Sequence, residues 1–212
     1  MAAPRIDADA CSARRAGSGM IDARKLQSRL AVVQDGVIGP NTLRALFARM
    51  GASPTFAGPF GRAASEHFRT YGILDSGLRL AHFMGQTCHE SDHFRTLEEY
   101  ASGAAYEGRS DLGNTQPGDG RRYKGRGLIM ITGHANYRRV GALIGVDLEA
   151  HPERAEEPEI AVHTACQWWA DNGCNALADA DNITALTKRI NGGLTGLDDR
   201  KALTNKAKGL IL

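Results

Sequence analysis

A short segment rich in acidic residues and histidine, His89–His93, is the first feature of the chain that could carry chemistry. It follows an apolar run with helical spacing, so Glu90 is expected at the edge of a core. Burial disfavours the charged form of a carboxyl group, and a carboxyl that stays protonated near neutral pH can act as a general acid. The acidic pair Glu98 and Glu99 follows shortly afterwards. Two carboxyl groups flanking a scissile bond are the usual apparatus of glycoside hydrolysis, which this pattern therefore indicates.

The segment His89–His93 also matches His-Glu-x-x-His, a pattern typical of zinc peptidases. That mechanism needs both histidines on one face of an uninterrupted helix, with Glu90 as the base and a third ligand downstream. Ser91–Asp92 has poor helix propensity, and no Gly-x-x-His follows. Glu98 or Glu99 could still supply the third ligand. From these residues alone, a zinc peptidase stays open as an alternative.

Two later segments decide between these chemistries. Tyr123–Tyr137 contains Tyr-Lys-Gly-Arg-Gly, an apolar run and an Asn-Tyr pair, and Ile190–Gly193 is followed by Gly196–Arg200. Together with His89–Ser91 and the acidic pair, these motifs resemble the chitinase-like lysozymes of glycoside hydrolase family 19, which are found in phage endolysins. The resemblance covers about residues 78 to 205 with its motifs in the same order, so it favours the glycosidase over the peptidase.

The resemblance implies roles for individual residues. Glu90 matches the proton donor, Glu99 rather than Glu98 matches the second catalytic carboxylate, and Thr132 matches a hydroxyl that helps to hold the attacking water. Members of the family invert the anomeric configuration, so the two carboxyl groups should leave room for a water. No metal or other cofactor is expected. The residues expected to bind substrate are Tyr123, Asn136, Asn191 and Arg200.

The expected activity is hydrolysis of the β-1,4 bonds of bacterial peptidoglycan by an endolysin that causes lysis of the host cell. One departure from the family concerns the substrate. Met130 occupies a position where the family usually has Gln, and a thioether cannot match the hydrogen bonds of an amide to an acetamido sugar. Chitin, a polymer of N-acetylglucosamine with the same linkage, is therefore the alternative substrate.

The elements that must position these residues are predicted to be mainly helical. Strand signal is limited to Leu128–Ile131. We therefore expect a mainly α fold of the α+β lysozyme-like kind, with at most a small β element and an irregular region over 100–124. The predicted helices of this domain span about 62–71, 77–90, 133–144, 157–171, 182–191 and 197–208.

The chain before the catalytic domain is predicted to contain three parts. Residues 1–20 lack apolar periodicity and are expected to form a disordered leader. Residues 21–50 predict a helix, a loop and a second helix, in which Leu26, Leu30 and Val33 are helically spaced. The loop Asp35–Thr42 resembles the loop of small peptidoglycan-binding modules, although a hairpin packed on the main domain explains it too. Gly and Pro in residues 51–61 indicate a linker, which places the catalytic domain at 62–212.

Composition narrows the remaining possibilities. A net charge of +2 is too small to indicate nucleic-acid binding, and the chain lacks an apolar stretch long enough to insert into a membrane. The beginning of the sequence lacks the apolar region of a secretory signal, so we expect the protein to reach the wall from the host cytoplasm after membrane permeabilisation.

The four cysteines are expected to be reduced, with a pairing of Cys166 and Cys174 left open. The expected partners are peptidoglycan glycan strands, bound by a monomer.

Overall fold

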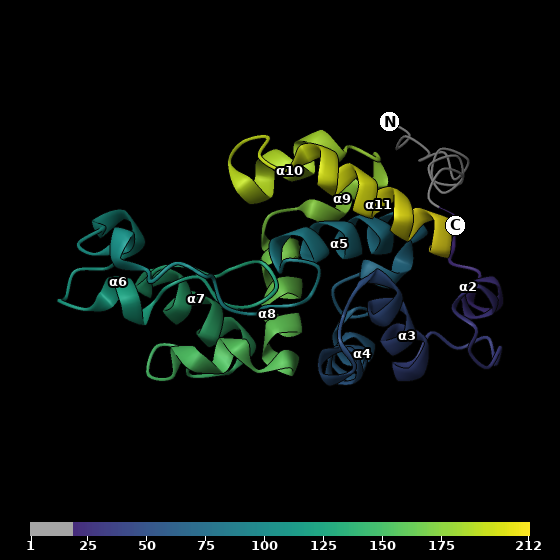
Figure 1. Cartoon of the computed structure of the whole chain (residues 1–212), viewed down its shortest axis with the longest axis horizontal. Coiled ribbons are helices and arrows are strands. Elements are labelled where there is room, and N and C mark those ends of the chain that lie inside the picture. Colours follow the sequence, from purple (N-terminus) through teal and green to yellow (C-terminus); the bar gives the residue numbers. More distant parts are fainter. Residues whose placement is uncertain (1–18) are drawn as a thin grey trace, which may run out of the picture.

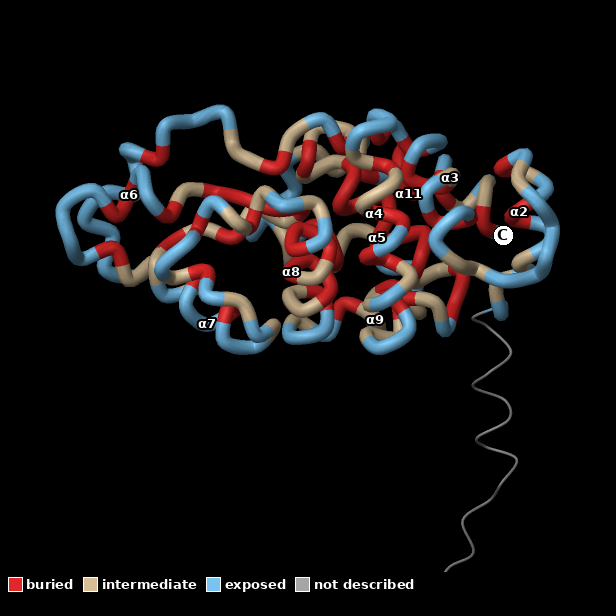
Figure 2. Tube along the Cα trace, turned by 90° about the horizontal axis from the view of Figure 1, so that it is seen from below, coloured by how far each residue is buried: buried red, intermediate tan, exposed pale blue. Residues whose placement is uncertain are grey.

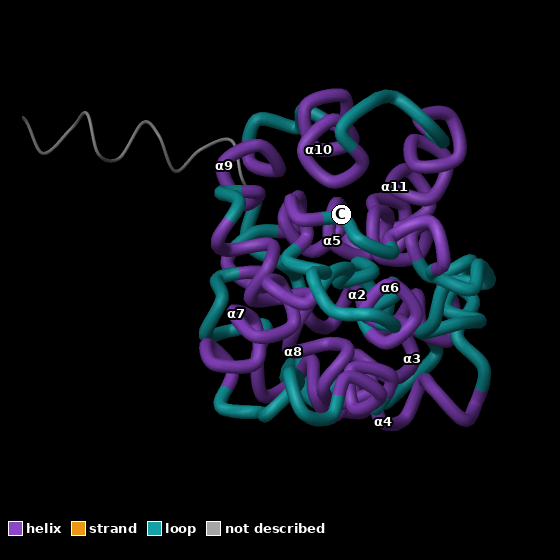
Figure 3. The backbone as a smooth tube through the Cα atoms, turned by 90° about the vertical axis from the view of Figure 1, so that its left-hand side faces the viewer, coloured by secondary structure: helices purple, strands orange, loops and turns teal. Residues whose placement is uncertain are grey.

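The computed structural model describes residues 19–212, and their regular secondary structure is helical (Figure 1). In this part of the chain no strand forms, and the only β pairing is a set of isolated bridges that join Arg126 to Glu98 and to Ile131 (Figure 3). The prediction of a mainly α fold with at most a small β element is therefore confirmed, and within Leu128–Ile131 only Ile131 takes part in a bridge. The α-helices are α2 (Ala23–Leu30), α3 (Pro40–Met50), α4 (Pro54–His67), α5 (Gly77–Glu90), α6 (Asp119–Arg122), α7 (His134–Ile144), α8 (Pro158–Asp171), α9 (Cys174–Asp179), α10 (Ile183–Asn191) and α11 (Leu197–Ile211). Short 3₁₀ turns lie at η1 (Ile73–Asp75), η2 (Ala104–Tyr106), η3 (Ser110–Leu112) and η4 (Pro152–Glu156).

Helix α5 lies at the centre of the fold, with the bounds that its sequence predicts. It begins after Ser76, whose hydroxyl accepts a hydrogen bond from the Arg79 amide, and every residue from Leu80 to Cys88 is buried. Helix α11 packs along it, and α3, α4 and α8 lie below it in Figure 1. A Cβ atom at Gly85 would stand 2.2 Å from the Thr204 hydroxyl oxygen, so only glycine permits this close approach of α5 and α11.

The predicted linker is wrong, because residues 54–67 form helix α4. Pro54 starts the helix at its first position, where a missing amide hydrogen costs nothing. The ring of Phe60 is fully buried and its centroid lies 5.2 Å from that of Phe47 in α3. A Cβ atom at Gly61 would stand 2.6 Å from the Arg44 amide nitrogen, so this glycine lets α3 and α4 cross closely. The Gly and Pro residues of this segment therefore serve a packed helix pair.

Residues 21–50 share the main core of the protein. Leu26, Leu43 and Phe47 belong to the same buried cluster as Phe83 of α5 and Trp169 of α8. The segment is therefore a helical hairpin that packs on the main body. Figure 2 shows buried residues, in red, continuing from α8 and α5 into α3 and α4.

The loop between α2 and α3 is held by one buried amide side chain. Gln27 Nε2 donates to Asp35 Oδ1 at 2.6 Å and to the Thr42 hydroxyl at 3.0 Å, and Asp35 accepts from the Val37 amide at 2.8 Å. These hydrogen bonds hold the pKa of Asp35 below its usual value. The helical pattern predicted to reach Val33 stops earlier, because α2 ends at Leu30 and Val33 is exposed. The predicted leader over 1–20 lies almost wholly outside the described residues.

A second, smaller cluster forms the lobe that contains α6 and α7. Tyr123 and Tyr137 pack there with apolar residues from the loop after α7 and from α8. Arg126 is buried beside them and donates to the Tyr137 hydroxyl at 3.2 Å and to Glu156 at 2.7 Å. Because a buried guanidinium without such partners would cost several kcal/mol, Arg126 fixes the segment that carries the Gly-Arg-Gly motif.

The cysteines within residues 19–212, namely Cys88, Cys166 and Cys174, are free and buried. Burial raises the pKa of the Cys88 and Cys174 thiols to about 12, which keeps them protonated near neutral pH. The possible pairing of Cys166 with Cys174 is therefore not formed. Across the same residues, no helix is both long and apolar enough to cross a membrane.

A stacked histidine pair between α4 and α8 makes the fold sensitive to acid. The His67 and His163 rings lie 3.8 Å apart, and His163 Nε2 lies 3.0 Å from the Tyr71 hydroxyl. Burial, and then the charge of His67, lower the pKa of His163 from 6.5 to about 4. The unfolded chain therefore binds more protons than the folded one between these pH values, and stability falls as the pH is lowered through them.

We predict that the free energy of unfolding, measured with urea, decreases as the pH falls from about 6.5 to about 4. A His163→Gln variant keeps a hydrogen-bonding group near Tyr71 and removes the titrating ring, so its stability should depend less on pH in this window. An equal pH dependence of the two chains would show that His163 does not contribute.

Candidate active site

A groove of about 400 Å³ opens where α5 ends. Glu90 lies on one side of it, at the last position of α5, and Glu99 reaches it from the following loop. The structure thus brings together the two carboxylates that the sequence pattern singles out. The groove is lined by His89, Glu90, Asp92, His93, Thr96, Glu99, Tyr100, Met130 and Asp199.

The end of α5 contradicts the zinc-peptidase alternative. Ser91 is the C-cap of the helix, and the next three residues, Asp92–Phe94, all have positive φ. His89 and His93 therefore do not share a face of one helix, and His89 Nδ1 instead lies 2.6 Å from Asp199 Oδ2. Within residues 19–212, no group of three or more His, Cys, Asp and Glu side chains is arranged to hold a metal ion.

Glu90 is held by a buried arginine. Arg200, on α11, is 2% exposed, and its guanidinium donates to Glu90 Oε1 and, at 2.6 Å, to Gln86 Oε1. Its Nε donates to the Thr195 carbonyl at 3.3 Å, so all of the guanidinium nitrogens are engaged. Among the described residues, Glu90 Oε2 has no hydrogen-bond partner, which leaves this oxygen available to a ligand. In this structure Arg200 contacts Glu90 and interior protein groups, so its most direct effect is to hold Glu90, and a sugar contact of its own stays a prediction.

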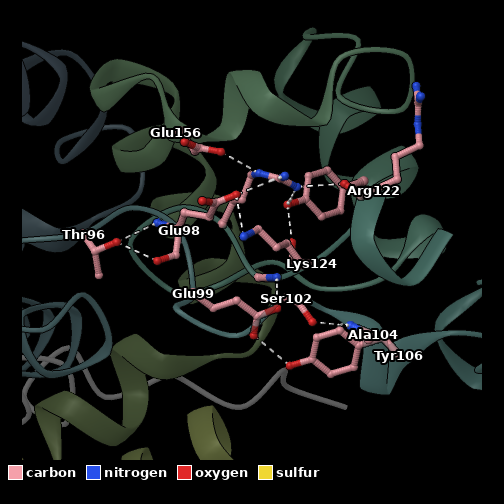
Figure 4. A network of polar contacts seen from close by, with 12 residues as sticks. Thr96, Glu98, Glu99, Ser102, Ala104, Tyr106, Arg122, Lys124 and Glu156 are labelled. Carbon is pink, nitrogen blue, oxygen red and sulfur yellow. Dashed lines mark hydrogen bonds and ion pairs between the residues drawn. The ribbon is translucent and has the colours of Figure 1, made fainter. Parts of the chain in front are cut away.

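Glu99 is held by donors from a different part of the chain. The Gly125 amide donates to Glu99 Oε1 at 3.0 Å, and the Tyr106 hydroxyl donates to Oε2 at 2.9 Å (Figure 4). A Cβ atom at Gly125 would stand 3.3 Å both from Glu99 Oε2 and from the Thr132 hydroxyl oxygen. The absence of a side chain at Gly125 therefore lets this carboxylate and the Thr132 hydroxyl approach the same point beside the backbone. Sequence reasoning missed Tyr106, which no local pattern connects to Glu99.

Glu98, unlike Glu99, forms ion pairs with neighbouring cations. It lies 2.8 Å from Lys124 Nζ and 3.3 Å from Arg126 Nη2, and Arg126 is also paired with Glu156 (Figure 4). Two cations therefore compensate the Glu98 charge, and none of these three residues lines the groove. The geometry favours Glu99 as the second functional carboxylate.

A hollow of about 200 Å³ adjoins the groove, and Met130 lines both. Thr132 and Asn136 line this hollow, and Asn136 Nδ2 donates to the Thr132 carbonyl at 2.8 Å. Trp168 and Ile190 add apolar surface to it. Met130 has a φ of 48°, an uncommon value for a residue with a side chain, which sets its position between the two spaces.

The other two residues expected to bind sugar do not line the groove or the hollow. Tyr123 is 5% exposed, its ring is stacked on His134, and its hydroxyl donates to the Glu149 carbonyl at 3.0 Å. Burial therefore gives Tyr123 a structural role in the second cluster. Asn191 is exposed at the end of α10, where Gly192 caps the helix in the left-handed conformation. A sugar contact at Asn191 stays a prediction.

Comparison with known proteins gives the class of this molecule. The family model described as class I chitinase, which represents glycoside hydrolase family 19, matches residues 50–185. The chain therefore belongs to glycoside hydrolase family 19. A glycosyl hydrolase family 19 domain-containing protein of Haemophilus influenzae is 38% identical over 48% of this chain and 49% of its own length. An endochitinase of Arabidopsis thaliana is 33% identical over 74% of this chain and 56% of its own length. The chain thus spans about half the length of these curated relatives.

Solved structures show the same fold. Chitinase C from Streptomyces griseus superposes with a TM-score of 0.63 at 18% identity, covering 79% of this chain and 75% of its own. A class IV chitinase from Zea mays superposes with a TM-score of 0.54 at 22% identity, covering 87% and 89% of the two chains. The mainly helical, lysozyme-like architecture is therefore that of the family.

The pair of Arg200 and Glu90 provides a test of this geometry. Arg200→Met keeps most of the apolar stem but leaves a largely buried carboxylate without its partner, which should lower the free energy of unfolding by about 3 kcal/mol. Glu90→Gln keeps an oxygen that accepts from Arg200 and should cost less. Urea unfolding of both variants checks this order, and a smaller loss for Arg200→Met than for Glu90→Gln would contradict it.

Proposed function

We propose that this protein hydrolyses β-1,4 glycosidic bonds between N-acetylated sugars by acid and base catalysis. One observation carries the proposal. Glu90 and Glu99 come from different segments, are held by separate sets of donors, and line the same open groove. Membership of glycoside hydrolase family 19 supports the same reaction class.

The two carboxyl groups take different roles in the proposed reaction. Glu90 donates a proton from Oε2 to the leaving glycosidic oxygen while Arg200 fixes its other oxygen. Glu99 accepts a proton from a water molecule that attacks the anomeric carbon, and the Thr132 hydroxyl beside Gly125 helps to orient that water. The tethering of Glu99 through Tyr106 and the Gly125 amide keeps its carboxylate in place during attack. Direct attack by water inverts the anomeric configuration.

We infer that the natural polymer is bacterial peptidoglycan. Its N-acetylmuramic acid differs from N-acetylglucosamine by a lactyl ether, which needs room beside the sugar ring and whose methyl group can make apolar contact. The hollow next to the groove offers both, through Met130, Trp168 and Ile190. Chitin is the alternative, supported by the endochitinases among the relatives. Peptidoglycan as substrate places the site of action at the cell wall, reached by an endolysin after the membrane is breached, with the hairpin of residues 21–50 as an additional wall contact.

The adjacent glutamates offer a matched test. Glu90→Gln and Glu99→Gln should each lower the rate of glycan hydrolysis by about 10²- to 10⁴-fold, since each removes a group that transfers a proton. Glu98→Gln changes a neighbouring carboxylate by the same atoms and should keep most of the activity. The rates are measured as new reducing ends. Loss of activity in Glu98→Gln with an active Glu99→Gln would overturn the assignment.

The same assay, run on purified peptidoglycan and on colloidal chitin, tests the substrate. The unmodified chain should release reducing ends faster from peptidoglycan. Faster release from chitin would favour the alternative while leaving the two-carboxylate mechanism intact. Release of peptides without new reducing ends would contradict a glycosidase altogether.

A further inference from the structure

The ring of Tyr100 is unusually exposed for a large side chain. It is 81% exposed and lines the groove directly after Glu99. Of the exposed large apolar side chains in residues 19–212, Tyr100 alone lines this groove. Since burial of such a ring would stabilise the fold, its position in solvent contributes little to folding.

The ring is nevertheless held in place. The Tyr100 hydroxyl donates to Asp92 Oδ2 at 2.9 Å, and this hydrogen bond raises the pKa of Tyr100, which keeps the hydroxyl a donor. Asp92 begins the left-handed turn after α5. The turn is anchored by Phe94, whose buried ring lies 5.2 Å from that of Phe47. The core therefore fixes the acceptor, and the acceptor orients the exposed ring.

We propose that Tyr100 is a sugar-stacking residue, whose ring packs against the apolar face of a pyranose bound in the groove beside Glu99. The proposal rests on the proposed function and names a specificity residue for that site. A pyranose ring presents axial C–H groups on its faces, and an aromatic ring that is already oriented loses little conformational entropy on binding. The hydroxyl is occupied by Asp92, so the face of the ring, rather than its polar tip, is the part offered to a ligand.

The position of Tyr100 also predicts how it affects the reaction. Glu99 is tied to Gly125 through its amide, which donates to the Gly125 carbonyl at 2.9 Å, and through its side chain. A sugar stacked on the next residue is therefore placed at a fixed distance from the catalytic carboxylate. Removing the ring should weaken binding and raise KM more than it lowers kcat, because the stack is present before and during the reaction.

The test uses the Glu90→Gln chain, which should bind glycan without cutting it, and the hexamer of N-acetylglucosamine as the probe. Adding Tyr100→Ala should weaken the affinity measured by calorimetry about tenfold, whereas Tyr100→Phe keeps the ring, loses only the hydrogen bond that orients it, and should weaken affinity by about two- to threefold. Leu143→Ala, which removes another exposed side chain away from the groove, is the matched control and should leave affinity unchanged.

Two results would overturn the proposal. Unchanged affinity in Tyr100→Ala would show that the ring does not contact the sugar, and an equal loss in Tyr100→Phe would assign the effect to the hydroxyl. Thermal unfolding of each variant shows that the fold is retained. The proposed function fails on a different readout, namely continued hydrolysis by the Glu90→Gln chain, so the two failures are distinguishable.

Discussion

The contact between the buried guanidinium of Arg200 and the carboxylate of Glu90 is the constraint on which the site depends. It requires α11 to lie along α5, and the lack of a side chain at Gly85 permits that approach. The groove beside this contact also requires α5 to stop at Glu90, because a helix continued through Asp92–Phe94 would abolish the turn that forms its wall. The anchoring of Phe94 in the core stabilises that turn and connects the site to the N-terminal helices.

The position of Glu99, the second carboxylate of the groove, depends on contacts with a different part of the chain. Glu98 forms an isolated bridge with Arg126, and the amide of Glu99 donates to the Gly125 carbonyl at 2.9 Å. The cations of Lys124 and Arg126 pair with Glu98, whereas Glu99 accepts hydrogen bonds from Tyr106 and the Gly125 amide and lines the groove. The smaller lobe therefore contributes the positioning of Glu99, while the larger helical core contributes Glu90.

The sequence predicts an element of this fold well where one face of a helix packs on the core and its apolar residues recur with helical spacing. Helical periodicity located α5 with its bounds, because its apolar residues face a core throughout. The linker prediction failed because Gly61 and Pro54 have the same local signature in a loop as in a closely packed helix pair. The adjacent acidic residues indicated a catalytic pair, but the choice of Glu99 depends on cations about thirty residues away and on Tyr106, which no spacing rule connects to them. Burial of Arg200 and Tyr123 likewise follows only from tertiary packing.

The anomeric form of the first product tests the central claim most directly. A proton donor at Glu90 and a water activated by Glu99 make a single displacement, so hydrolysis of a β-1,4-linked glycan should initially release the α-anomer. Proton NMR during the first minutes of digestion distinguishes the anomers before they equilibrate. Initial release of the β-anomer would require a retaining mechanism and would contradict the roles assigned to Glu90, Glu99 and the water between them.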